Sequence, residues 1–110
     1  MTSSKQQFKD FILDQLSSLD AVEPRAMFGG YGLYRGGVFF GIIHKNRLYF
    51  KTDPDDAAST EPYRARGMKP FRPNKKQPLK SYYEVPADVI EEPAALAEWA
   101  ARAVLNGGAK

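Results

Sequence analysis

The segment RAMFGGYGLYRGGVFFG, residues 25–41, is the most informative part of this chain about its structure. It places six of the nine glycines within seventeen residues and alternates them with large apolar and aromatic side chains. Glycine inside a strand weakens that strand, so its repeated use indicates tight turns, bulges or the close approach of another backbone or a ligand. We therefore expect a β-hairpin that turns at Arg35-Gly36-Gly37.

A phosphate cradle is the alternative interpretation of these glycines, because consecutive backbone amides can bind an anion. Gly30 and Gly32 are followed by Arg35 where a dinucleotide-binding fingerprint requires a third glycine, and no Gly-Lys-Ser/Thr sequence follows as in a P-loop. The stretch also lies between predicted strands rather than at the start of a helix. We favour a hairpin that lets two layers, or two subunits, approach closely, and we expect no cofactor.

The segments around this stretch show helical and strand periodicity in turn. Apolar residues with helical spacing predict a helix over residues 4–19, and Pro24 bars its continuation. Three strands of a meander follow, at Met27–Tyr34, Val38–His44 and Arg47–Thr52. A second helix is expected from Asp53 to about Arg66, with a kink or break at Pro62.

The last part of the chain contains two more predicted strands and a closing helix. An edge strand or loop is expected around Phe71, and a strand over Leu79–Val85. A single helical turn is predicted near Pro86, followed by a helix from Pro93 to Gly107. The buried stripe of that helix is expected to contain Leu96, Trp99, Ala100 and Ala103.

The resulting order, α-β-β-β-α-β-β-α, predicts a single α+β domain over residues 1–110. We expect two layers: an antiparallel sheet of about five strands, with the helices packed on one side. The strand Val38–His44 is apolar on both faces, which indicates that both faces are covered. Since the helices cover one face, this pattern favours a protein partner on the other, and a symmetric homodimer is the commonest kind.

Composition excludes several classes of protein. The absence of cysteine removes disulfides, thiolate nucleophiles and cysteine-based metal sites. No segment approaches the roughly 20 apolar residues that span a bilayer, and the N-terminal residues lack the apolar core of a secretory signal. We expect a soluble, cytoplasmic protein without membrane contact.

Charge is distributed unevenly along the chain. The formal net charge is only +3, yet residues 64–80 hold seven basic side chains and no acidic one, against nine basic and thirteen acidic elsewhere. Such a stretch can contact an anionic partner, and Tyr63, Phe71, Tyr82 and Tyr83 nearby could stack on bases. Tyr82 and Tyr83 point to opposite faces of one strand, so at most one can join a single platform. The candidate contacts are Arg64, Arg66, Lys69, Arg72, Lys75, Lys76 and Lys80, and the alternatives are a solvated loop or an acidic protein surface.

The other chemical candidates have structural explanations. His44 is the only histidine, and without cysteine it lacks the partners that a zinc site needs. Asp53, Asp55 and Asp56 lie at the predicted start of a helix, where carboxylates cap free amides and meet the positive end of the helix dipole. We predict no catalytic residue and no metal ligand.

Several ordered motifs resemble the TfoX/Sxy N-terminal domain family. The first is Arg25-x-Met27-Phe28-Gly29-x-x-Gly32-Leu33-Tyr34-x-x-Gly37-x-x-Phe40-Gly41, and the later ones include Leu48-Tyr49-x-Lys51, Gly67-Met68-x-Pro70-Phe71, Tyr82-Tyr83-x-Val85-Pro86 and a closing Trp99-Ala100. The residues that carry the resemblance are Arg25, Met27, Phe28, Gly29, Gly32, Gly37, Phe40, Tyr49, Lys51, Pro70, Phe71, Tyr82 and Tyr83. They extend over nearly the whole chain.

The resemblance implies an α+β domain with an antiparallel sheet and no established catalytic residues. Named members of the family are bacterial regulators of natural competence that assist a transcription activator and carry a second, helical domain. We expect a stand-alone short member without that domain. The favoured function is a non-enzymatic, dimeric module for protein contacts, linked to transcription regulation. A nucleic-acid-binding module using Arg64 to Lys80 is the alternative, and an enzyme is the third.

Overall fold

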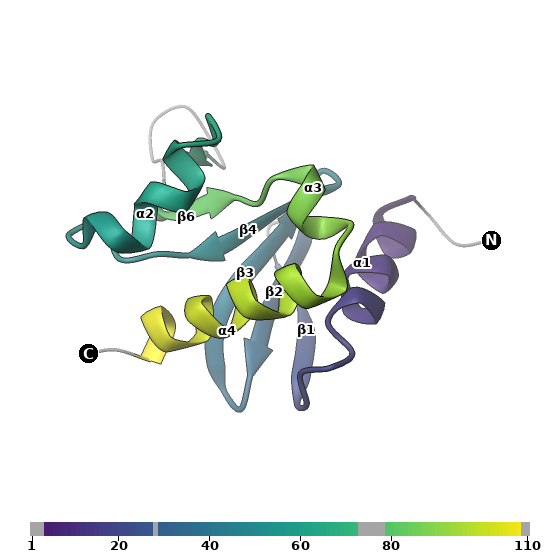
Figure 1. Cartoon of the computed structure of the whole chain (residues 1–110). Helices are drawn as coiled ribbons and strands as arrows, with labels where there is room; N and C mark the ends of the chain where they lie inside the picture. Colours follow the sequence, from purple (N-terminus) through teal and green to yellow (C-terminus); the bar gives the residue numbers. More distant parts are fainter. Residues whose placement is uncertain (1–3, 28, 73–78, 109–110) are drawn as a thin grey trace.

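A computed structural model describes residues 4–27, 29–72 and 79–108. The chain folds into one antiparallel sheet with helices packed on it, which confirms the predicted α+β class (Figure 1). The strands are β1 (Val22–Met27), β2 (Gly30–Arg35), β3 (Val38–His44), β4 (Arg47–Lys51), β5 (Pro70–Phe71) and β6 (Leu79–Glu84). The helices are α1 (Ser4–Gln15), α2 (Ala57–Arg64), α3 (Ala87–Ile90) and α4 (Pro93–Gly108).

The sheet has six strands in the order β1-β2-β3-β4-β6-β5, one more than the sequence indicated. The additional strand is β1, which precedes the expected strand Met27–Tyr34 and shares only Met27 with it. Met27 ends β1 and Gly30 begins β2, and Gly29 between them has φ +75°, a conformation that side chains rarely adopt. The first four strands therefore form a continuous meander in which each strand pairs with the next.

Both outer strands of the sheet are irregular. β1 contains Pro24, which has no backbone N–H to donate, and was not predicted for that reason. β5 has two residues and pairs with β6 through a shift in register between Pro70 and Phe71. A hairpin over Arg35 to Val38 and a bulge at Leu33/Tyr34 shape the middle of the sheet.

The helices are shorter than predicted at two places. α1 ends at Gln15 rather than near Leu19, although Leu16 still packs in the core. α2 covers Ala57–Arg64 instead of beginning at Asp53, and it continues for two residues past Pro62. Gly67, with φ +73°, ends this helical segment as the left-handed residue after the helix, and Met68 N–H donates to the Tyr63 carbonyl at 3.0 Å.

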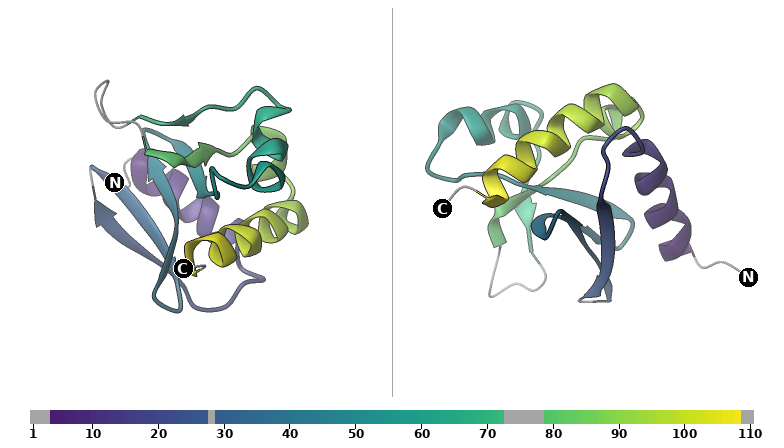
Figure 2. Two further views of the ribbon diagram at one scale, coloured as in Figure 1. Left: turned by 90° about the vertical axis from the view of Figure 1, so that its left-hand side faces the viewer. Right: turned by 90° about the horizontal axis from the view of Figure 1, so that it is seen from below.

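The main core lies between the sheet and the helices. Each of the four helices contributes to it, and Figure 2 shows α4 crossing the sheet with its C-terminal end beside α2. The predicted stripe of α4 is confirmed, with Leu96, Ala100 and Ala103 buried and Trp99 partly buried. The sheet residues of this core are Leu33, Phe40, Ile43, Leu48 and Phe50.

A second, smaller cluster covers the opposite face of the sheet. It consists of Ile42, Tyr49, Phe71 and Tyr82, with Phe39 packed against them. Phe71 is 1% exposed and its ring lies 4.6 Å from that of Tyr49. β3 is thus apolar on both faces because the chain covers both faces itself, so this pattern does not require a second subunit.

Within the described ranges, no helix has the length and hydrophobicity that crossing a membrane would require.

Candidate functional site

The basic residues predicted to contact an anion are distributed over several elements. Arg64 and Arg66 lie at the end of α2, while Lys69 and Arg72 are exposed on either side of β5. Arg66 forms an ion pair with Asp88 of α3, and its guanidinium lies 5.4 Å from the centre of the Trp99 ring. Lys75 and Lys76 lie outside the described residues, as does the side chain of Lys80. The segment stays a predicted contact surface.

The aromatic residues near this segment belong to two different clusters. Tyr63 and Tyr83 meet on the helix side of the sheet, with ring centres 5.7 Å apart. Phe71 and Tyr82 belong to the cluster on the other side. The prediction that Tyr82 and Tyr83 point to opposite faces is confirmed, and these four rings do not form one stacking platform.

The glycine-rich stretch lets neighbouring strands and side chains approach closely, as predicted from its sequence. Gly32 pairs with Arg25 across β1 and β2, and the side chains of Met27, Tyr34 and Phe39 close over it. The Arg25 guanidinium lies 4.6 Å from the centre of the Tyr34 ring, and Tyr34 stacks on Phe39 at 5.0 Å. A Cβ atom at position 32 would lie 2.4 Å from Met27 Sδ, so the Met27 side chain would have to shift.

The acidic and histidine candidates have local structural roles. The Asp56 carboxylate accepts a hydrogen bond from Ala58 N–H at 3.0 Å and caps α2, as predicted. Asp53 Oδ1 accepts from Asp55 N–H at 3.0 Å. The His44 ring lies 5.2 Å from that of Phe71, and the described ranges contain no group of three or more acidic or histidine side chains arranged to hold a metal ion.

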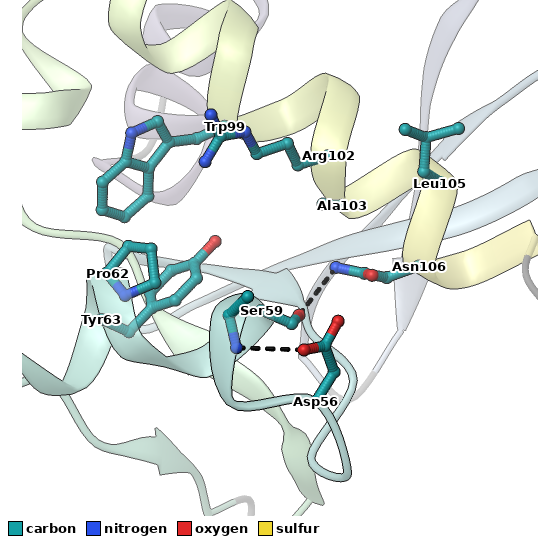
Figure 3. Close-up of a pocket in the computed structure, with 10 residues that line it drawn as sticks. Asp56, Ser59, Pro62, Tyr63, Trp99, Arg102, Ala103, Leu105 and Asn106 are labelled. Carbon is teal, nitrogen blue, oxygen red and sulfur yellow. Dashed lines mark hydrogen bonds between the residues drawn. The ribbon is translucent and has the colours of Figure 1, made fainter.

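A groove lies between α2 and the second half of α4 (Figure 3). Its volume is about 280 Å³. Pro62 and Tyr63 of α2 face Trp99 of α4 across it, and the rings of Tyr63 and Trp99 meet edge to face at 4.8 Å. The remaining lining residues are Asp56, Ala58, Ser59, Arg102, Ala103, Leu105 and Asn106. We call this surface the α2–α4 groove.

Asn106 holds the two walls of the α2–α4 groove together. Its Nδ2 donates to the carbonyl of Lys51 at 3.1 Å and to Ser59 Oγ at 3.1 Å. Because a carbonyl oxygen only accepts, the first of these bonds fixes which side-chain atom is nitrogen. Ser59 Oγ also accepts from Asp53 N–H at 2.8 Å. The Asn106 Oδ1 atom is left as an acceptor.

Tyr63 is the buried polar residue of the α2–α4 groove. Its side chain is 5% exposed, and burial raises the pKa of its hydroxyl well above the usual value. None of the described residues forms a hydrogen bond with this hydroxyl, which points into the groove in Figure 3.

A second depression lies between α1 and α3, with a volume of about 300 Å³. Phe11 at its edge is 43% exposed. The ion pair of Arg47 Nη1 with Glu84 Oε1, at 3.1 Å, also borders it. The lining of this depression exposes less polar surface than that of the α2–α4 groove.

Comparison with known protein families identifies the chain. A family model described as the TfoX N-terminal domain matches residues 14–106. The chain belongs to the TfoX N-terminal domain family. No curated protein matches it.

In this TfoX N-terminal domain most motif residues lie away from the α2–α4 groove, and Trp99 of the closing motif lines it. Tyr49, Phe71 and Tyr82 lie in the cluster on the helix-free side of the sheet, and Phe40 lies in the main core. The groove was not predicted from the sequence, because Trp99 was expected only as part of a buried stripe. Leu105 was the available signal: it is an apolar residue outside that stripe, and it is 72% exposed.

Proposed function

We propose that this TfoX N-terminal domain is a non-enzymatic module for protein contacts and that the α2–α4 groove is its contact site. The observation that carries the proposal is Leu105, a large apolar side chain that is 72% exposed at the rim of a groove walled by Trp99 and Tyr63. Exposed apolar side chains beside aromatic walls are typical of surfaces that a protein partner covers, and tryptophan and tyrosine are enriched among the residues that dominate such interfaces.

The polar groups of the groove support binding rather than catalysis. The family is generally not an enzyme family. Ser59 Oγ accepts hydrogen bonds from two N–H groups, and no described histidine or lysine is positioned to take its proton. A nucleophilic serine needs an adjacent base to be activated.

Transcription regulation is the setting that we propose for this contact, on the basis of the family resemblance. A homodimer stays a prediction. The apolar character of both faces of β3 suggested a second subunit, but residues of the same chain cover both faces.

Site-specific photo-crosslinking in native cells tests the contact site. A crosslinking amino acid is placed at position 105, and at Asp14, an exposed residue of α1, as the control. We expect a partner band from position 105 that position 14 does not give. The captured protein, once identified and purified, should bind the wild-type chain at least about tenfold more tightly than Leu105→Asp, as expected when a central apolar side chain is replaced by a charge. Equal bands from both positions, or no change with Leu105→Asp, would contradict the proposal.

A further inference from the structure

Asp56 is the only charged residue on the α2 side of the groove lining, and the chain around it is acidic as far as Pro62; Arg64, at the end of α2, does not line the groove. Residues 53–62 contain Asp53, Asp55, Asp56 and Glu61 and no lysine, arginine or histidine. None of these four carboxylates forms an ion pair with a described residue. In contrast, Asp20, Glu84 and Asp88 each pair with an arginine elsewhere in the chain.

The arginines near the groove are compensated by other carboxylates. Arg102 Nη2 lies 2.9 Å from Glu98 Oε1, one turn earlier on α4. Arg66, which lies over Trp99, pairs with Asp88. Among the charged residues that line the groove, Asp56 is therefore the one without an ion pair to a described residue, and its charge favours a cation.

Oxygen atoms suited to N–H donors line the groove: those of Asp56 and Asn106 lie beside Ser59 at one end, and the Tyr63 hydroxyl lies toward Trp99 and Arg102 (Figure 3). Only one oxygen of the Asp56 carboxylate caps α2, through Ala58 N–H, and the other is not engaged by a described residue. Asn106 Oδ1 is held as an acceptor by the bonds of its amide nitrogen. The Tyr63 hydroxyl, on a side chain that is 5% exposed, points into the groove without a hydrogen-bond partner among the described residues. Because the described residues include no buried side-chain polar atom without a partner, this hydroxyl is open to the groove and available to a bound group.

The size and the other walls of the groove suit side chains of a protein. A volume of about 280 Å³ is slightly below the range typical of small-molecule pockets, roughly 300–1,000 Å³. Leu105 and Pro62 supply apolar contact, while Trp99 supplies an aromatic wall. A basic side chain would fit the oxygen atoms of the groove, and apolar side chains would fit the surfaces of Trp99, Pro62 and Leu105.

We propose that the α2–α4 groove receives a segment of a partner protein that places a lysine or arginine against Asp56 and Asn106, an N–H donor against the Tyr63 hydroxyl, and apolar side chains against Trp99 and against Leu105. This inference rests on the proposed function and specifies the chemistry of its partner.

A random 12-residue peptide library displayed on phage tests this preference. The library is selected on the immobilised full chain and counter-selected on Leu105→Asp. We expect the enriched peptides to combine lysine or arginine with leucine, isoleucine or an aromatic residue. Enrichment of acidic or uncharged peptides, or no enrichment over the Leu105→Asp chain, would overturn the inference.

Three variants then locate the contact by fluorescence anisotropy with an enriched, labelled peptide. Asp56→Asn removes the charge and keeps an efficient helix cap, so α2 is preserved. We expect Asp56→Asn to bind the peptide about fivefold more weakly than the wild-type chain, as for the loss of a partly desolvated ion pair. We expect Tyr63→Phe to bind it about twofold more weakly. Asp53→Asn removes the same charge outside the groove lining and should change the affinity by less than about 1.5-fold, because screened surface charges contribute little. Equal losses for Asp56→Asn and Asp53→Asn would refute the assignment.

Two further outcomes separate this inference from the proposed function. A crosslinked partner at position 105 together with a preference for acidic peptides would support the proposed function. It would overturn the inference that the partner supplies a basic segment. A wild-type dimer that Leu105→Asp converts to a monomer would assign the groove to a second copy of the chain, which would also overturn it.

Discussion

At the scale of single residues, the glycines of β2 are required by their neighbours rather than by backbone conformation. A Cβ atom on Gly30 would lie 2.0 Å from the carbonyl oxygen of Ile43, and one on Gly32 would lie 2.4 Å from Met27 Sδ. Backbone cannot move aside as a methionine side chain can. We expect Gly32→Ala to lower the free energy of unfolding by about 1–3 kcal/mol and Gly30→Ala to lower it further, measured by urea denaturation.

A double-mutant cycle provides the control for Gly32. In a Met27→Ala background the nearest obstacle to a new Cβ is gone, and the rings of Phe39 and Tyr34 remain at 3.2 Å. Gly32→Ala should then destabilise the chain less than it does beside Met27. The same loss in both backgrounds would show that the sulfur atom is not the cause.

Tyr82 makes the stability of the chain sensitive to alkaline pH. Burial, with a smaller contribution from Tyr34, raises the pKa of Tyr82 to about 12. A tyrosine in the unfolded chain ionises near pH 10, whereas Tyr82 in the folded chain keeps its proton to higher pH. The contribution of Tyr82 to stability is therefore complete below pH 10 and is lost between about pH 10 and 12. Burial raises the pKa of Tyr63 in the same direction.

We expect Tyr82→Phe to reduce the fall in thermal midpoint between pH 9.5 and 11.5, roughly the window set by the free and buried pKa values of tyrosine. Circular dichroism melts of both proteins at several pH values measure the difference. Parallel curves for the two proteins would exclude Tyr82 as a source of the sensitivity.

At the scale of elements, Asn106 joins α4 to both β4 and α2. Asn106→Asp keeps the shape of the side chain but removes the amide donor and places a carboxylate oxygen against the Lys51 carbonyl. We expect a loss of about 2–3 kcal/mol in unfolding free energy and faster hydrogen exchange in α2. Asn46→Asp, an identical change in an exposed turn, should cost less than about 0.5 kcal/mol. A similar loss for the two changes would argue against the bridging role.

The order and type of most elements could be predicted because their periodicity is local. The stripe of α4 and the strand Val38–His44 are examples, since burial follows directly from spacing along the chain. β1 could not be predicted, because Pro24 and charged neighbours conceal an outer strand that a tertiary pairing with β2 stabilises. The α2–α4 groove depends on where α2 lies relative to Trp99, which no local pattern specifies.

At the scale of the whole molecule, the basic stretch leaves nucleic-acid binding as a testable alternative. If residues 64–80 bind phosphates, neutralising Lys75, Lys76 and Lys80 should weaken the binding of a labelled DNA duplex. The slope of log affinity against log salt concentration should also become shallower, by about 0.9 for each phosphate that the chain no longer neutralises. Fluorescence titrations at several salt concentrations measure this slope. No binding at about 50 mM salt, where the attraction to phosphates is strong, would remove the alternative.

The oligomeric state is a second property of the whole molecule that can be measured directly. Sedimentation velocity over a wide concentration range tests the predicted homodimer. A monomer at the highest concentration would contradict it, and would agree with the internal covering of Ile42 by Phe71 and Tyr82.

The two outer strands of the sheet have a consequence for how the chain behaves when crowded. Strand β1 carries a proline and charged side chains, and β5 offers only two residues. Aggregation through sheets usually begins when a free strand edge pairs with another chain, and proline, charge and shortness are the features that block this step. The folded domain is therefore protected against edge-to-edge polymerisation, and its α2–α4 groove can remain exposed without making the sheet a template for fibrils.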